Sequence, residues 1–334
     1  LVAARAIQGA GAVSAAVTAL LADLTRDGVR TRAMAMIGLS IGLTFSVSLV
    51  VAPMIADMIG VPGLFMLTGI LTVISIGVVA WMTPDPEVSK LHEDTQAQPS
   101  RMGEVLRDRQ LLNLDFGIFA LHAAQMALFT ALPFAMTQLG LEKIQHWKVY
   151  LPSTIAGLVI MIPLIIIGET RNKLKQVFIL GIACIAAAQI GLLFGMHSIW
   201  LITAYLVVYF IGFNVLEASL PSMVSKIAPA DLKGTAMGVY NTMQSVGLFV
   251  GGASGGWLFQ QYGFAGVFTF CSVLMLLWLV IAVLAPAPKP VKNLSYPVSP
   301  AWQEKHDSLY QALSQVEGVE SIAFSADKQT IYIK

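Results

Sequence analysis

The sequence RAIQGAG at residues 5–11, followed by ADLTRDGVRTR at residues 22–32, begins a pattern of segments that returns about 200 residues later. Shifting the numbering by 203 residues places Gly60 on Gly263 and Gly63 on Gly266. Each copy contains an apolar segment with small residues, a short charged turn and two further apolar segments. A repeat of apolar segments at so long a period is typical of the internal symmetry of transporter folds.

The composition predicts an all-α polytopic membrane protein. Apolar residues make up 56% of the chain and charged residues 12%, and the mean hydropathy is +0.74. The apolar residues gather in runs long enough to cross a bilayer. The basic residues are scattered among short turns, which excludes a nucleic-acid-binding surface. Cys184 and Cys271 lie inside apolar runs, which indicates packed thiols rather than metal ligands or a disulfide.

We expect nine membrane-spanning helices of roughly 20 residues each. Their expected ranges are 2–22, 33–56, 63–83, 111–139, 149–168, 177–196, 199–224, 235–258 and 264–285. Asp115 and His122 interrupt the fourth. Basic residues occupy every second turn between the spans, and cytoplasmic loops are enriched in Lys and Arg. The pattern therefore predicts a cytoplasmic C-terminus.

The repeat predicts two halves of six spans each. Spans one to three match spans seven to nine, so we expect roughly 95 residues with three more spans before this chain. The expected parts are the last three helices of the N-terminal half at 1–83, a cytoplasmic linker at 84–110, the C-terminal half at 111–285, a second linker at 286–292 and a small domain at 293–334.

The pattern changes after the last span. Residues 293–298, 319–324 and 330–334 alternate as strands do, and residues 300–317 fit an amphipathic helix. Strand–helix–strand–strand is the first part of a ferredoxin-like fold, so we expect a partial α+β domain of that kind. Because the C-x-x-C motif of metal-binding versions is lacking before the helix, we predict no metal.

Several motifs resemble those of the major facilitator superfamily. Arg5, Gln8, Gly9 and Gly11 match its R-x-x-Q-G-x-G pattern, and Gly38, Gly42 and Pro53 resemble a motif of its drug/proton antiporters. The segments at 146–151, 175–178 and 233–240 are similar to the YajR-type branch, whose members carry a small cytoplasmic domain after the last helix. The resemblance implies a twelve-span transporter of a bacterial inner membrane.

The same resemblance implies roles for particular residues. Arg5 is associated with proton coupling, although a charged residue at that depth also serves as an interhelical hydrogen-bonding anchor. A gate on the cytoplasmic side is implied by charged turns and by the N-terminus of the eighth span, whose N–H groups favour an anion. The expected gating residues are Asp23, Arg30, Arg32, Gly234, Thr235, Glu169 and Arg171.

Three spans carry polar pairs at a spacing of three residues, which places each pair on one helix face. The pairs are His122 with Gln125, Asn214 with Glu217, and Asn241 with Gln244. A shared aqueous cavity explains all three, and hydrogen bonding between helices is the alternative. A carboxyl group in apolar surroundings favours its protonated form, so Glu217 and His122 are candidates for proton binding. The four amides are candidates for the substrate cavity.

Glycines recur at a spacing of four residues in the eighth span, at Gly247, Gly251 and Gly255. Small residues at this spacing let two helices approach closely. We expect this stripe, with Gly38, Gly42 and Pro53, to serve helix packing.

The chain has no phosphate-binding loop and no enzyme motif, so we expect neither ATP hydrolysis nor a cofactor. The leading hypothesis is a secondary transporter that exports small lipophilic compounds in exchange for protons, in contact with the bilayer. A proton symporter for a nutrient and a membrane sensor that does not transport are the alternatives. The sequence names no partner for the C-terminal domain.

Overall fold

The computed structural model describes most of the helical chain and part of the C-terminal domain. The described residues are 17, 20, 27–84, 101–171, 173–229, 232–286, 294–299, 302, 306–316, 318–319, 322–324 and 330–333. The chain divides into two compact units, Leu1–Leu91 and His92–Lys334. The expected span at 2–22 therefore lies outside the described residues except at positions 17 and 20, and Arg5 and Asp23 lie outside them entirely.

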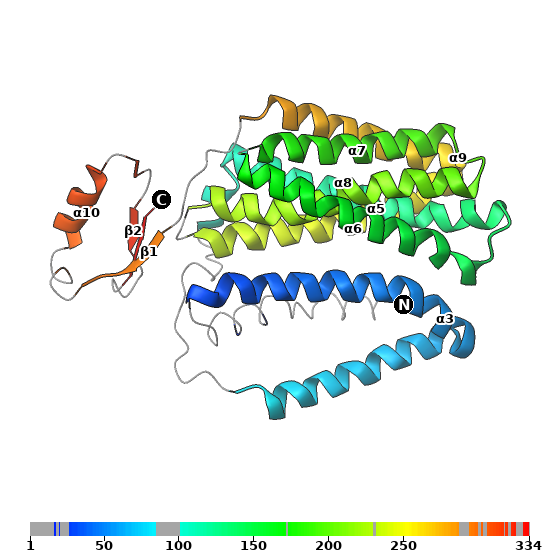
Figure 1. Ribbon diagram of the computed structural model, residues 1–334, viewed down its shortest axis with the longest axis horizontal. Coiled ribbons are helices and arrows are strands. Elements are labelled where there is room, and N and C mark those ends of the chain that lie inside the picture. The colour runs from blue at the N-terminus through cyan, green and yellow to red at the C-terminus, as the bar shows by residue number, and fades with distance from the viewer. Residues whose placement is uncertain are drawn as a thin grey trace. The chain divides into compact units, whose positions relative to one another are not determined.

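Two long helices each fold back on themselves at a glycine (Figure 1). Helix α3, Asp27–Met82, bends at Gly60, which has φ 72° and ψ 170°. Helix α9, Lys233–Leu284, bends at Gly263, which has φ 63° and ψ −151°. This backbone region is open in practice to glycine alone. The two hinges are separated by the repeat spacing of 203 residues, so the sequence repeat is also a structural repeat.

The residue three positions after each hinge is a second glycine in matching surroundings. A Cβ atom on Gly63 would lie 2.7 Å from the side chain of Ile59, and one on Gly266 would lie 2.6 Å from that of Tyr262. In both cases the obstructing residue precedes the glycine by four positions. In both bends, the side chain four positions earlier therefore leaves no room for a Cβ atom on this glycine. Each arm of the two bent helices corresponds to one expected span.

The remaining membrane helices belong to the second unit. They are α5, Arg109–Gln138; α6, Trp147–Thr170; α7, Leu174–Phe194; and α8, Ile199–Ile227. Short helices α4, Met102–Val105, and η2, Lys143–Gln145, precede α5 and α6. Figure 1 shows α5 to α9 lying side by side. Among the described residues, six helices are long and apolar enough to cross a membrane, and α9 is counted as one of them although its bend divides it into two arms.

Side-chain hydrogen bonds cap the start of α5 and the end of α9. The carboxylate of Asp108 accepts hydrogen bonds from the backbone N–H of Gln110 at 2.7 Å and of Leu111 at 3.2 Å, which caps the N-terminus of α5. At the end of α9, Lys175 Nζ donates to the carbonyl of Ala285 at 2.5 Å and to that of Val283 at 3.2 Å. A cation at this position also complements the helix dipole.

Helix α5 is the most deeply buried membrane helix of the second unit, with both arms of α9 packed against it. The first arm runs parallel to α5, because Gly247, Gly251 and Gly255 meet the backbone of Phe119, Ala123 and Ala127 in turn. In the second arm, the ring of Trp278 packs against Gly117, and Cys271 Sγ lies 3.7 Å from the carbonyl oxygen of Ala124. Of the most apolar stretch of α5, 67% is buried inside the protein. The core of the second unit is therefore built around α5.

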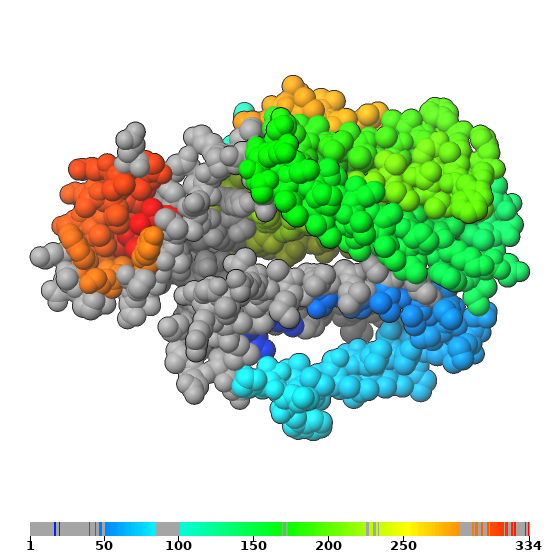
Figure 2. Space-filling view, in the orientation of Figure 1, coloured from blue at the N-terminus to red at the C-terminus, as the bar shows by residue number. Residues whose placement is uncertain are grey.

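Helix α6 is the least buried membrane helix of this unit, and it forms part of the unit's surface (Figure 2). Its exposed apolar side chains follow a helical spacing along one stripe, at Ile155, Val159, Ile162 and Ile166. In a membrane protein such a stripe faces lipid, since lipid and apolar side chains mix without cost.

The described C-terminal residues form a small sheet with one helix. The elements in chain order are β1, Leu294–Pro297; α10, His306–Ser314; β2, Ile322–Phe324; and β3, Thr330–Ile333. The sheet order is β1-β3-β2, and β3 runs antiparallel to both neighbours. Strands β1 and β2 are thus parallel with β3 between them. The order of elements agrees with the strand–helix–strand–strand expectation, although α10 is shorter than the expected helix at 300–317.

Candidate functional site

His122 occupies the middle of α5, about 20 Å along the helix from Arg109 at 1.5 Å per residue. Its Nδ1 lies 3.2 Å from the carbonyl oxygen of Ile118, which can only accept, so Nδ1 carries the proton. The other ring nitrogen, Nε2, lies 2.8 Å from Nε2 of Gln244 on α9. In the neutral imidazole this Nε2 is an acceptor, and the amide of Gln244 donates to it.

Glu217 on α8 approaches the same ring nitrogen from another helix. Its Oε2 lies 3.7 Å from His122 Nε2. This oxygen is buried and has no hydrogen-bond partner among the described residues, although 42% of the whole side chain is exposed. A buried carboxyl oxygen without a partner is costly, which is typical of a group with a function. His122 Nε2 therefore has two competing neighbours, Gln244 and Glu217.

Aromatic side chains of α8 enclose this cluster. The ring of Phe213 meets the ring of His122 edge-on, with centroids 6.0 Å apart, and Tyr209 stacks on Phe213 at 5.9 Å. The hydroxyl of Tyr209 is buried without a hydrogen-bond partner among the described residues, and so is Nδ2 of Asn214. Two polar groups beside Glu217 thus retain unused hydrogen-bonding capacity.

In the described part of the chain, the residues of each polar pair that the sequence spacing predicts are not bonded to one another. Within the described residues no hydrogen bond links His122 to Gln125, Asn214 to Glu217, or Asn241 to Gln244. Gln125 is buried, and Asn241 is exposed. The contacts run instead between helices, from α5 to α8 and α9.

The expected gating and packing residues lie as follows. Gly234 and Thr235 are in the first turn of α9, and Thr235 is buried. Arg171 follows the end of α6 and is exposed. The side chains of Glu169, Arg30 and Arg32 lie outside the described part of the chain, although their backbones are helical. The first arm of α3 contains Gly38, Gly42 and Pro53.

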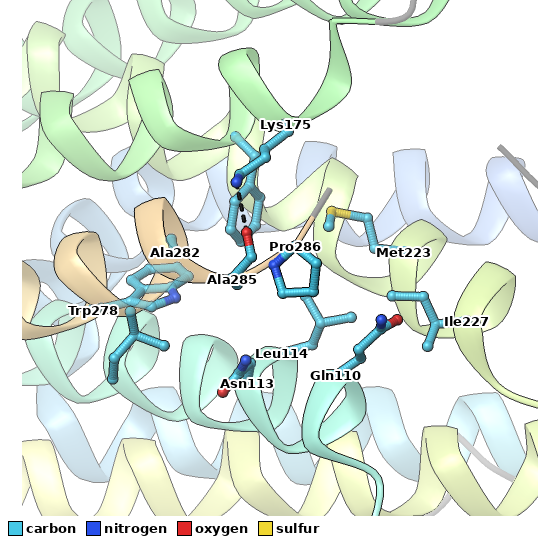
Figure 3. A pocket seen from close by; sticks show the side chains of 12 residues that line it. Gln110, Asn113, Leu114, Lys175, Met223, Ile227, Trp278, Ala282, Ala285 and Pro286 are labelled. Carbon is cyan, nitrogen blue, oxygen red and sulfur yellow. Dashed lines mark hydrogen bonds between the residues drawn. The ribbon is translucent and has the colours of Figure 1, made fainter. Parts of the chain in front are cut away.

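A separate pocket opens between the ends of α5, α7, α8 and α9 (Figure 3). Lys175 reaches across it to the carbonyl of Ala285, and Trp278 and Met223 supply apolar walls. Its volume is about 50 Å³. The lining residue of α5 nearest to His122 is Leu114, about 12 Å away along the helix axis. The pocket is therefore distinct from the cluster at His122.

Asp115 and Tyr209 are among the buried polar residues that the sequence does not single out for the site. Asp115 is 3% exposed, and its Oδ2 has no hydrogen-bond partner among the described residues. It precedes His122 by seven positions, two helical turns, and this spacing is the signal that could have grouped it with His122. Tyr209, the other, has no such signal, since a Tyr in an apolar run is usually packing.

The comparisons with known proteins agree with this architecture. The family model of the Major Facilitator Superfamily matches residues 1–252, with a second match at 175–316. The chain belongs to the Major Facilitator Superfamily. Within the superfamily, it is 36% identical over 330 residues to the inner membrane transport protein YajR of Escherichia coli, which covers 99% of this chain and 72% of that protein.

Two further relatives are more distant. An uncharacterized transporter of Buchnera aphidicola is 27% identical over 289 residues, covering 84% of this chain and 72% of that protein. The multidrug resistance protein MdtH of Cronobacter sakazakii is 26% identical over 226 residues, covering 63% of this chain and 54% of that protein. The expected superfamily is thus confirmed. As a Major Facilitator Superfamily member with several apolar helices, this chain is a multi-pass membrane transporter and not an enzyme.

Proposed function

We propose that this protein couples the movement of protons to the outward movement of small lipophilic compounds, in opposite directions across the membrane. One observation carries the proposal. His122, Glu217 and Gln244 come from three different helices and meet inside their candidate spans, with His122 at the middle of its own. Ionisable residues inside a membrane are expensive and mark ion or proton pathways.

The geometry at His122 Nε2 supplies a switch between two states. While the imidazole is neutral, Nε2 accepts from Gln244, and Glu217 stays at 3.7 Å. When a proton binds Nε2, this nitrogen becomes a donor and can no longer accept from the amide of Gln244. It then favours the carboxylate of Glu217. A proton thereby changes which helix His122 bonds to, within the half that moves against the other half in alternating access.

The proposal of a lipophilic substrate has separate support. MdtH is named a multidrug resistance protein, and Gly38, Gly42 and Pro53 resemble an antiporter motif. The aromatic wall beside His122 provides apolar contact area, and the proposed cavity residues supply polar contacts. These are Gln125, Asn214, Asn241 and Gln244.

We extend the proposal to the remaining residues singled out by sequence. Arg5 would assist proton coupling from the other half. We propose gating roles for Asp23, Arg30, Arg32, Glu169 and Arg171, and for the start of α9 at Gly234 and Thr235.

The topology and the C-terminal domain are also proposals. We place the C-terminus in the cytoplasm, because the basic turns alternate. We assign the C-terminal sheet to a ferredoxin-like domain, because the β1-β3-β2 order and the helix between β1 and β2 agree with its first part.

The test is transport in proteoliposomes with a pH gradient and a clamped membrane potential. The probe panel contains lipophilic dyes and a permanently charged lipophilic cation, whose partition does not itself respond to pH. We expect probe to accumulate in liposomes with an acidic interior and to be released by a protonophore. Glu217→Gln and His122→Asn should abolish the accumulation. Accumulation only when the exterior is acidic would replace antiport with symport, and no probe movement with folded protein would favour a sensor.

The matched control is Glu104→Gln. Glu104 is an exposed carboxylate outside the candidate spans, and Arg101 donates hydrogen bonds to it at 2.8 and 2.7 Å, which lower the pKa of Glu104. It therefore stays ionised over the range of the assay. Transport that falls as far in Glu104→Gln as in Glu217→Gln would remove the case for a specific site at Glu217.

A further inference from the structure

Asp115 is a buried carboxyl group that the proposed switch at His122 does not use. It lies on α5 about 9 Å along the helix from Arg109, inside the candidate span, with 3% of its surface exposed. Its Oδ2 has no hydrogen-bond partner among the described residues. The described part of the chain also contains no Lys, Arg or His within ion-pair distance of it. The side chain is therefore neither a helix cap nor half of a structural ion pair.

The ionisable groups that face Asp115 are few. From α9, the phenol of Tyr240 lies close enough to Asp115 and to Glu217 of α8 for the charge of either carboxylate to act on it. Tyr240 is itself 4% exposed. Lys175 of α7, at the ends of the same helices, is held by the carbonyls that end α9. Tyr240 thus lies near both Asp115 and the carboxyl group of the proposed coupling site.

The polar side chains of α5 and α9 follow one another along the two helices. Asp115 and His122 lie seven positions apart on one face of α5, and Tyr240 and Gln244 lie four positions apart on one face of α9. The parallel contacts of the glycine stripe hold the two faces together along the same direction. Gln244 bonds to His122 at the deep end. Nearer the start of the two helices, Tyr240 precedes Gln244 by about one turn on α9, and Asp115 precedes His122 by two turns on α5.

We propose that Asp115 is a second proton-binding group, and that it exchanges protons with Glu217 past Tyr240 on the side where α5 and α9 begin. This inference rests on the proposed proton coupling and gives it a path. A carboxyl group that lacks a cationic partner in apolar surroundings can hold a proton near neutral pH and release it when water or a neighbour changes. The phenol can both donate and accept a hydrogen bond, so it suits a relay position.

The test reads protonation directly, by infrared difference spectroscopy of the reconstituted protein during a pH titration above the range in which exposed carboxylates titrate. Protonated carboxyl groups give a carbonyl band that ionised ones lack. We expect wild type to show two such bands, Glu217→Gln to lose one, Asp115→Asn to lose the other, and the double variant to lose both. A spectrum of Asp115→Asn identical to wild type would overturn the inference.

Two further variants keep the test independent of folding and of the proposed function. Asp115→Glu retains the carboxyl group, so its band should shift rather than vanish, and an unshifted band would also count against Asp115. Tyr240→Phe removes only the hydroxyl, and we expect it to slow proton exchange while both bands remain. If Asp115→Asn loses its band but the wild type transports no probe, the proposed function is refuted while Asp115 remains a proton-binding group.

Discussion

Replacing Gly263 by alanine isolates the cost of the bend in α9. The glycine has φ 63° and ψ −151°, and a Cβ atom there would meet nothing within 4 Å. The penalty therefore comes from backbone conformation alone. Holding a residue with a side chain in this region costs about 1–3 kcal/mol. Restricting the unfolded chain returns about 0.4–1 kcal/mol, which leaves a difference of about 0–2.6 kcal/mol, and we expect a net loss in its middle part, about 1–2 kcal/mol.

The assay follows thermal unfolding of the detergent-solubilised protein with a thiol-reactive dye. Cys271 is completely buried and Cys184 is partly buried, so unfolding exposes natural thiols. A domain of this size loses about 2–4 °C of melting temperature per kcal/mol, which predicts a decrease of about 2–8 °C for Gly263→Ala. Gly256→Ala is the control, since Gly256 also has open space but lies within the regular helix.

The repeat extends the same prediction to Gly60, which has φ 72°. Gly60→Ala should destabilise the protein comparably, because its hinge has the same kind of backbone. If Gly263→Ala melts at or above the temperature of wild type while Gly256→Ala is not destabilised, the bend does not require its observed conformation and the reasoning fails.

Two other stability predictions follow from close contacts. Gly251→Ala should lower the melting temperature, because a Cβ atom there collides with the backbone of α5, at a cost of about 1–3 kcal/mol. Gly252→Ala is the control, since a Cβ atom at Gly252 has room. Equal melting temperatures of the two variants would contradict the close packing. Lys175→Met should cost about 1 kcal/mol in the same unfolding measurement, since the carbonyl of Ala285 loses its charged donor. Lys173→Met, which removes no such bond, is its control, and an equal loss in both would mean that the cap does not contribute.

The sequence predicts much of the helical fold because apolar length and glycine position are local signals. The expected spans at 235–258 and 264–285 coincide with the two arms of α9, and the repeat pairs the hinges Gly60 and Gly263 before any coordinate is known. The N-terminus of α5 is similarly local, because Asp108 caps it from the adjacent position.

The candidate site is less predictable because it depends on contacts between helices. Spacing within one helix places Asn241 beside Gln244, but only the register of α5 against α9 brings Gln244 to His122. That register comes from the close approach at the glycine stripe, whose partner helix no single sequence identifies. Asp115 differs from these, since its spacing of seven residues from His122 is a local signal that could have grouped the two.

The central claim is that protons and substrate move in opposite directions through the site at His122 and Glu217. The most direct measurement follows the pH inside proteoliposomes with a trapped indicator while a permanently charged lipophilic cation is driven outward by its own concentration gradient, with the membrane potential clamped. The account predicts that the interior acidifies as the cation leaves, and that Glu217→Gln abolishes this acidification. Cation efflux by wild type without a change of internal pH, or with alkalinisation, would contradict it.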